Sequence, residues 1–70
     1  MLNVFESVSQ QELKSLYENL IKSKELGIRP TLFDPYVKRL KDLCNFNAFS
    51  DATDFVISLF YQEVARRYFN

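Results

Sequence analysis

The residues that break helices are confined to one short stretch of this chain. Its only glycine, Gly27, and its only prolines, Pro30 and Pro35, lie close together in the 70-residue sequence. Glycine and proline interrupt regular structure, so this stretch is expected to separate two long segments that can each run without a break. No segment alternates polar and apolar residues as a half-buried strand does. The sequence therefore predicts an all-α fold, a small three-helix bundle.

The first helix is expected over residues 10–26. Ser9 and Glu12 have the spacing of a capping box, in which each side chain satisfies a backbone N–H at the start of the helix. Gly27 suits the left-handed position that commonly follows the last turn. Between these ends, apolar residues recur at spacings of three and four and form one helical face: Leu13, Leu16, Tyr17, Leu20 and Ile21.

A shorter helix is predicted over residues 35–44. Asp34 is a favourable N-cap, and Pro35 suits the first helical position, where its missing N–H needs no partner. We expect Cys44 to be buried as a small hydrophobe. The apolar stripe of this helix comprises Tyr36, Val37, Leu40, Leu43 and Cys44.

The third helix is predicted over residues 51–68, with apolar residues on two sides. Its broad face comprises Ile57, Phe60, Tyr61, Val64, Ala65 and Tyr68. Phe55 and Leu59 lie on nearly the opposite side, although a helix packed on one side of a bundle needs only one stripe. Either residues 1–5 and the loop before this helix cover the smaller patch, or another chain does.

The chain has the length of a single domain, residues 1–70, with a small core. A core in this size range rarely contributes more than about 3–5 kcal/mol to stability. The single cysteine cannot close an intrachain disulfide, and the absence of histidine excludes a Cys/His zinc site. We predict no metal and no cofactor. Hydrophobic residues make up 47 % of the chain, a share that favours further burial against another polypeptide.

The residue types present argue against catalysis. Without histidine the chain lacks the commonest general base near neutral pH and cannot form Ser-His-Asp or Cys-His pairs. A single glycine cannot build a glycine-rich phosphate loop. Most of the nine carboxylates, including Glu63, are interpreted as solvated surface groups or helix caps. We therefore predict that the protein is not an enzyme and has no catalytic residue.

Charge and hydropathy narrow the range of partners and locations. Nine basic and nine acidic residues cancel, so the composition gives no electrostatic reason to expect nucleic acid. No apolar run approaches the roughly 18 residues of a membrane span, and the first residues lack the pattern of a signal peptide. A lone cysteine fits a reducing compartment. These features predict a cytoplasmic protein without a membrane partner.

The interpretation that these residues favour is a non-enzymatic helical module for protein–protein interaction. It would be a small regulator or inhibitor that presents an apolar helix face to another protein or to a second copy in a homodimer. Exposed aromatic and arginine side chains commonly anchor such surfaces. The expected partner-binding residues are Phe46, Phe49, Phe55, Leu59, Arg66 and Arg67. The alternative is a small DNA-binding module that uses the second or the third helix.

Overall fold

Three helices and one 3-10 turn form the fold in the computed structural model, which describes residues 3–43 and 49–69. The elements are α1 (Gln10–Leu26), the 3-10 turn η1 (Thr31–Phe33), α2 (Asp34–Leu43) and α3 (Phe49–Tyr68). No strand occurs within the described ranges, so the prediction of an all-α three-helix fold is confirmed. The predicted bounds of α1 are correct, whereas α2 begins one residue earlier than expected and α3 two residues earlier. Cys44 lies outside the described residues.

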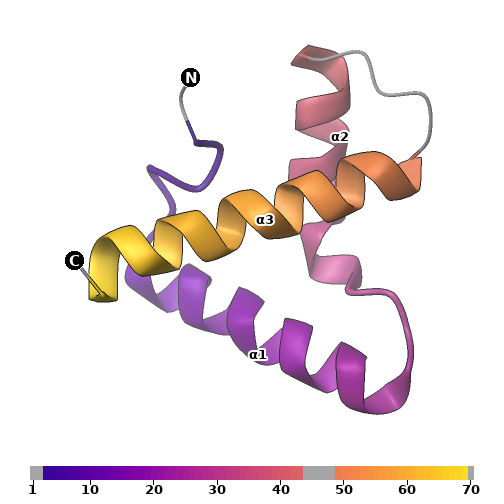
Figure 1. Ribbon diagram of the computed structural model, residues 1–70, viewed down its shortest axis with the longest axis horizontal. Coiled ribbons are helices and arrows are strands. Elements are labelled where there is room, and N and C mark those ends of the chain that lie inside the picture. The colour runs from indigo at the N-terminus through magenta and orange to yellow at the C-terminus, as the bar shows by residue number, and fades with distance from the viewer. Residues whose placement is uncertain (1–2, 44–48, 70) are drawn as a thin grey trace.

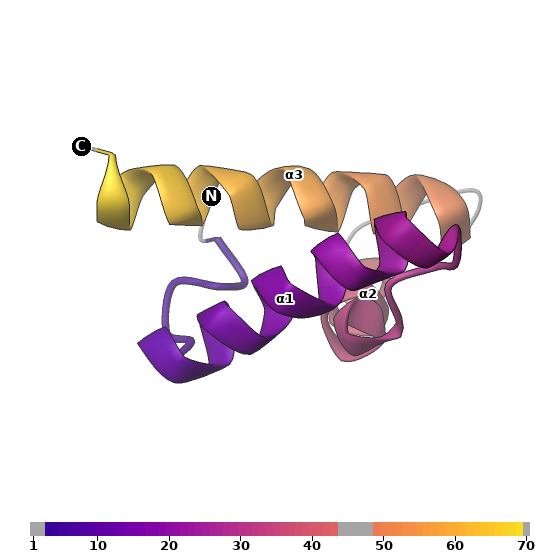
Figure 2. The same ribbon diagram turned by 90° about the horizontal axis from the view of Figure 1, so that it is seen from below.

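The three helices do not all lie parallel to one another. α1 and α3 run in roughly opposite directions, and α2 lies across them (Figure 1). In the perpendicular view α2 is seen nearly end-on, while the segment before α1 lies beside the C-terminal half of α3 (Figure 2). The closest helix pair is α2 with α3, and η1 contacts all three helices. Within the described part of the chain, no helix is long and apolar enough to cross a membrane.

α1 begins and ends where the sequence indicates, although within the described residues only the Ser9 half of the predicted capping box forms. The Ser9 Oγ accepts a hydrogen bond from the Glu12 backbone N–H at 3.1 Å. Gly27 has a φ of 67°, and its N–H donates to the carbonyl of Lys24. The N–H of Ile28 donates to the carbonyl of Ser23 at 3.0 Å, which completes a Schellman motif. A side chain with a Cβ would be strained at the left-handed Gly27, so this position ends the helix sharply.

The cap at Ser9 gives a simple stability test. Ser9→Ala removes the acceptor for the Glu12 N–H, and we expect a loss of about 1 kcal/mol. In a domain of this size, that loss should lower the melting temperature by about 4–8 °C in a thermal scan followed by circular dichroism. Ser15→Ala makes the same chemical change at an exposed interior position of α1, where alanine favours the helix. A Ser9→Ala variant that melts with the native protein would show that the cap contributes nothing.

The prediction that Asp34 caps α2 is wrong. Asp34 has helical dihedral angles, because η1 leads directly into α2 without an extended residue between them. Its carboxylate instead accepts hydrogen bonds from Arg29 Nη1 and Nη2 at 2.8 and 2.9 Å. This bidentate pair spans the connection between α1 and α2 and fixes the path of the chain into α2.

An aromatic cluster joins the N-terminal segment, η1 and α3. The rings of Phe5, Phe33 and Phe60 contact each other edge to face, with centroid distances of 5.2 to 6.1 Å. The ring of Tyr36 lies 4.7 Å from that of Phe5. All three phenylalanines are fully buried, and such edge-to-face pairs add to the free energy of burial. The remaining core residues are Leu13, Leu16, Leu20, Val37, Leu40, Ala52, Val56 and Leu59.

Each of the two apolar sides of α3 is partly buried and partly exposed, with Phe60 of the broad face fully buried. Leu59, expected on an uncovered patch, is only 5 % exposed and belongs to the core. Tyr61 and Tyr68, expected on the broad buried face, are both exposed. The cause is the N-terminal segment, because the Asn3 Nδ2 donates to the Leu59 carbonyl at 2.8 Å and Phe5 fills the core beside it. The chain therefore covers Leu59 itself, while Phe55 remains 38 % exposed and part of the broad face is open.

Candidate functional site: an apolar groove between α1 and α3

An open groove of about 550 Å³ lies between α1 and the C-terminal part of α3. Residues of both helices line it: Gln10, Leu13, Lys14, Tyr17, Tyr61, Val64, Tyr68 and Phe69. Six of these eight residues are aromatic or aliphatic. We take this apolar concavity as the candidate binding site.

Helical periodicity places these side chains along two facing walls. On α1, Gln10, Leu13 and Tyr17 follow one another at spacings of three and four residues, as do Tyr61, Val64 and Tyr68 on α3. Residues at these spacings lie on one face of a helix. The exposed part of the broad apolar face of α3 therefore faces α1.

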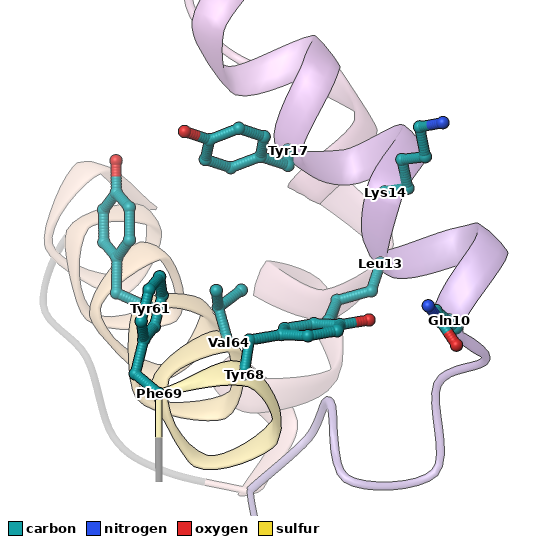
Figure 3. A pocket seen from close by; sticks show the side chains of 8 residues that line it. All are labelled: Gln10, Leu13, Lys14, Tyr17, Tyr61, Val64, Tyr68 and Phe69. Atoms are coloured by element: carbon teal, nitrogen blue, oxygen red, sulfur yellow. The ribbon is translucent and has the colours of Figure 1, made fainter.

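The groove exists because α1 and α3 are not packed closely against each other. η1 contacts both helices, and core side chains of both belong to one buried cluster. Tyr68 extends from α3 toward Leu13 and Gln10, and Tyr17 points from α1 toward Tyr61 (Figure 3). Long aromatic side chains therefore span part of the gap and leave the remainder open to solvent.

Positive charge borders this apolar surface. Lys14 lines the groove from α1. The Nζ of Lys24 donates to the Tyr61 hydroxyl at 3.2 Å and lies 5.8 Å from the centre of its ring. None of the described carboxylates lines the groove. The site is therefore apolar along its length, with tyrosine hydroxyls and ammonium groups at its edges.

The polar side chains that line the groove are spread along it. The polar groups of the lining are an amide, an ammonium and three tyrosine hydroxyls, and they do not converge on one point (Figure 3). Among the described residues, no three of the Asp, Glu, His and Cys side chains converge as metal ligands do.

The carboxylate of Glu63, on α3, is buried and hydrogen-bonded. Glu63, expected to be solvated, is 2 % exposed, so that prediction is wrong. It accepts hydrogen bonds from Arg66 Nε and Nη2 at 3.0 and 2.6 Å, and from Arg67 Nε at 2.6 Å. The bonds from Arg66 and Arg67 hold the pKa of Glu63 at about 2, below its ordinary 4.5, although burial alone would raise the pKa.

Arg67 also binds the N-terminal segment. Its Nη2 donates to the carbonyls of Phe5, Glu6 and Val8 at 3.0, 3.2 and 2.6 Å. A single guanidinium thus links the buried carboxylate of α3 to three backbone carbonyls of the turn before α1. This link sets the position of Phe5 in the core and, with it, the start of α1 at the mouth of the groove.

The structure brings few of the predicted partner-binding residues together. Leu59 is buried, and Arg67 is committed to Glu63 and to the N-terminal segment. Phe55 is 38 % exposed, and Arg66 is half-exposed beside Glu63. Phe46 lies outside the described residues, and so does the side chain of Phe49. The predicted residues do not include any member of the groove.

A signal for the groove was present in the sequence. The periodicity predicts that Tyr17 and Ile21 lie on the apolar face of α1, and Tyr61, Val64 and Tyr68 on that of α3. Each face is wider than the stripe that a three-helix core of this size can bury. The excess width on two helices indicated a shared apolar surface, although the sequence did not reveal that the two excess strips face each other.

No family model matches this chain, and no curated protein or solved structure is significantly similar to it.

Proposed function

We propose that the protein is a non-enzymatic helical interaction module, of the kind that serves as a small regulator or inhibitor. It would bind another polypeptide along the groove between α1 and α3. The observation that carries this proposal is the groove itself, an apolar concavity of about 550 Å³ on a domain of only 70 residues. Small soluble domains rarely leave a contiguous apolar surface open without a binding role for it.

A protein partner fits the charges better than DNA does. Proteins that bind duplex DNA present basic side chains on one face to neutralise phosphates. Here Arg66 and Arg67 are engaged with Glu63. On α2, Lys38 and Lys41 border a hollow together with Asp34 and Asp42. Neither cluster forms a basic face separate from carboxylates, so we favour a polypeptide ligand.

The proposal can be tested with a pair of matched variants. Tyr17→Gln and Tyr68→Gln together remove the aromatic rings from both walls of the groove, and both tyrosines are exposed, so the fold should persist. Leu32→Gln changes an apolar side chain on η1 that is as exposed as Tyr17 but lies outside the groove. Each protein would be immobilised and used for capture from an extract of the source organism, followed by mass spectrometry.

A partner should be recovered by the native protein and by Leu32→Gln, and recovery should fall at least tenfold with the double variant. Exposed aromatic anchors commonly contribute 2 kcal/mol or more each, which corresponds to more than tenfold in affinity. Circular dichroism would verify that helicity is retained. If the double variant recovers the same partner as the native protein, the groove is not the binding surface and the proposal fails.

A further inference from the structure

The occupant of the groove must satisfy its own backbone hydrogen bonds. The described walls of the groove are helices, whose backbone groups are already paired within α1 and α3. An extended peptide would therefore leave its N–H and C=O groups without partners on an apolar surface. A helix pairs these groups internally and offers only side chains to the walls.

The length of the groove suits two turns of such a helix. Gln10 to Tyr17 on α1, and Tyr61 to Tyr68 on α3, each span about 11 Å at 1.5 Å per residue. Apolar residues at positions i, i+3 or i+4, and i+7 of a bound helix span the same length. Three apolar anchors thus cover the lined part of the groove.

A second copy of the chain is a poorer occupant. Most homodimers use a two-fold axis, which places the same surface patch of each protomer against the other. Here that would set one concave groove against another and leave the space between them unfilled. A convex helix from a different protein would fill the groove and leave no such space.

The charged side chains at the groove indicate which residues the polar side of a bound helix should carry. Lys14 lines the groove, and Lys24 contacts Tyr61 at its edge. Both lysines are exposed, and they are ten residues apart on α1, about 15 Å along the axis. Lys24 and the carboxylates of α1 are not among the lining residues, but Lys24 reaches the groove through its contact with Tyr61. The α1 carboxylates are Glu12, Glu18 and Glu25. A partner with acidic side chains at the rim would complement these two ammonium groups.

We propose, as a deepening of the proposed function and resting on it, that the groove binds an acidic amphipathic helix of another protein. The helix lays an apolar stripe of about two turns between Tyr17 and Tyr68. It directs Asp or Glu side chains toward Lys14 and Lys24.

Two model peptides test this inference. Both are 16-residue helices with the same leucine stripe at positions i, i+3, i+4 and i+7. One carries Glu and the other Lys at the positions that flank the stripe. Binding would be measured by fluorescence anisotropy at low and high salt, and mapped on the native protein by NMR chemical-shift changes.

The Glu peptide should bind about three- to tenfold more tightly than the Lys peptide at low salt, the range expected for a few solvent-exposed ion pairs. High salt should reduce this preference. Lys14→Glu should abolish it, whereas Lys22→Glu, the same change at an exposed position of α1 outside the lining, should preserve it. Chemical-shift changes should centre on the residues that line the groove.

The results that would contradict this inference differ from those that would contradict the proposed function. Equal affinity for both peptides, with shifts in the groove, would overturn the acidic character of the partner and leave the proposed function standing. Absence of binding by either peptide would count against both. A dimer in sedimentation experiments that dissociates with Tyr17→Gln would identify a second copy as the occupant and overturn the inference.

Discussion

Phe5→Ala should abolish stable folding at room temperature. The Phe5 ring is fully buried and contacts the rings of Phe33, Tyr36 and Phe60. Truncation of a buried phenylalanine to alanine typically costs about 3–5 kcal/mol, as much as the core of so small a domain supplies in total. Far-UV circular dichroism and a thermal scan would reveal a large loss of helicity and of the cooperative transition.

Phe69→Ala is the matched control for this experiment. It removes the same side chain from the end of α3, where Phe69 is 81 % exposed and lines the groove without contributing to the core. Its melting temperature should remain close to that of the native protein. A Phe5→Ala variant that melts as the native protein does would contradict the role assigned to the N-terminal segment.

The second large effect should be a loss of stability in acid that depends on Glu63. Its folded pKa of about 2 is below the ordinary value of 4.5, so the unfolded chain takes up the proton first as the pH falls. The stabilisation from Glu63 is therefore fully present above about pH 4.5 and is lost as the pH falls toward 2. Urea titrations at several pH values would measure this decline in the free energy of unfolding.

Glu63→Gln should remove this part of the pH dependence. At neutral pH the variant should be less stable by on the order of 2 kcal/mol, because it loses charge-assisted hydrogen bonds to Arg66 and Arg67 in a buried position. Glu18→Gln, which changes an exposed carboxylate on α1, should retain the acid decline of the native protein. If the acid transitions of the native protein and of Glu63→Gln coincide, another carboxylate governs them.

Local features of the sequence predicted the helices well. The cap at Ser9 and the left-handed Gly27 involve residues within a few positions of each other, and both ends of α1 formed as expected. The 3-10 turn was missed because Pro30 and Pro35 indicated a loop. Phe33, a large apolar residue between those two prolines, could have indicated that the connection is buried.

The long-range arrangement could not be predicted in the same way. Periodicity gives the angle of each side chain around α3 but not the side from which its neighbours approach. The hydrogen bond from Asn3 to the Leu59 carbonyl and the insertion of Phe5 decide that question. The i+3 and i+4 spacings of Arg66 and Arg67 from Glu63 were visible, but the burial of the carboxylate depends on packing against the rest of the chain.

The bonds from Arg67 to the N-terminal turn also have a consequence for synthesis of the chain. Arg67 lies 62 residues after Phe5, so the ribosome adds Arg67 well after Phe5. At about 5–20 residues per second, the ribosome needs roughly 3–12 s to travel between them. Until α3 has emerged, the aromatic side chain of Phe5 has neither the ring of Phe60 nor the guanidinium that positions its backbone. We expect the domain to reach its final form only after α3 has emerged from the ribosome, and not progressively as α1 and α2 appear.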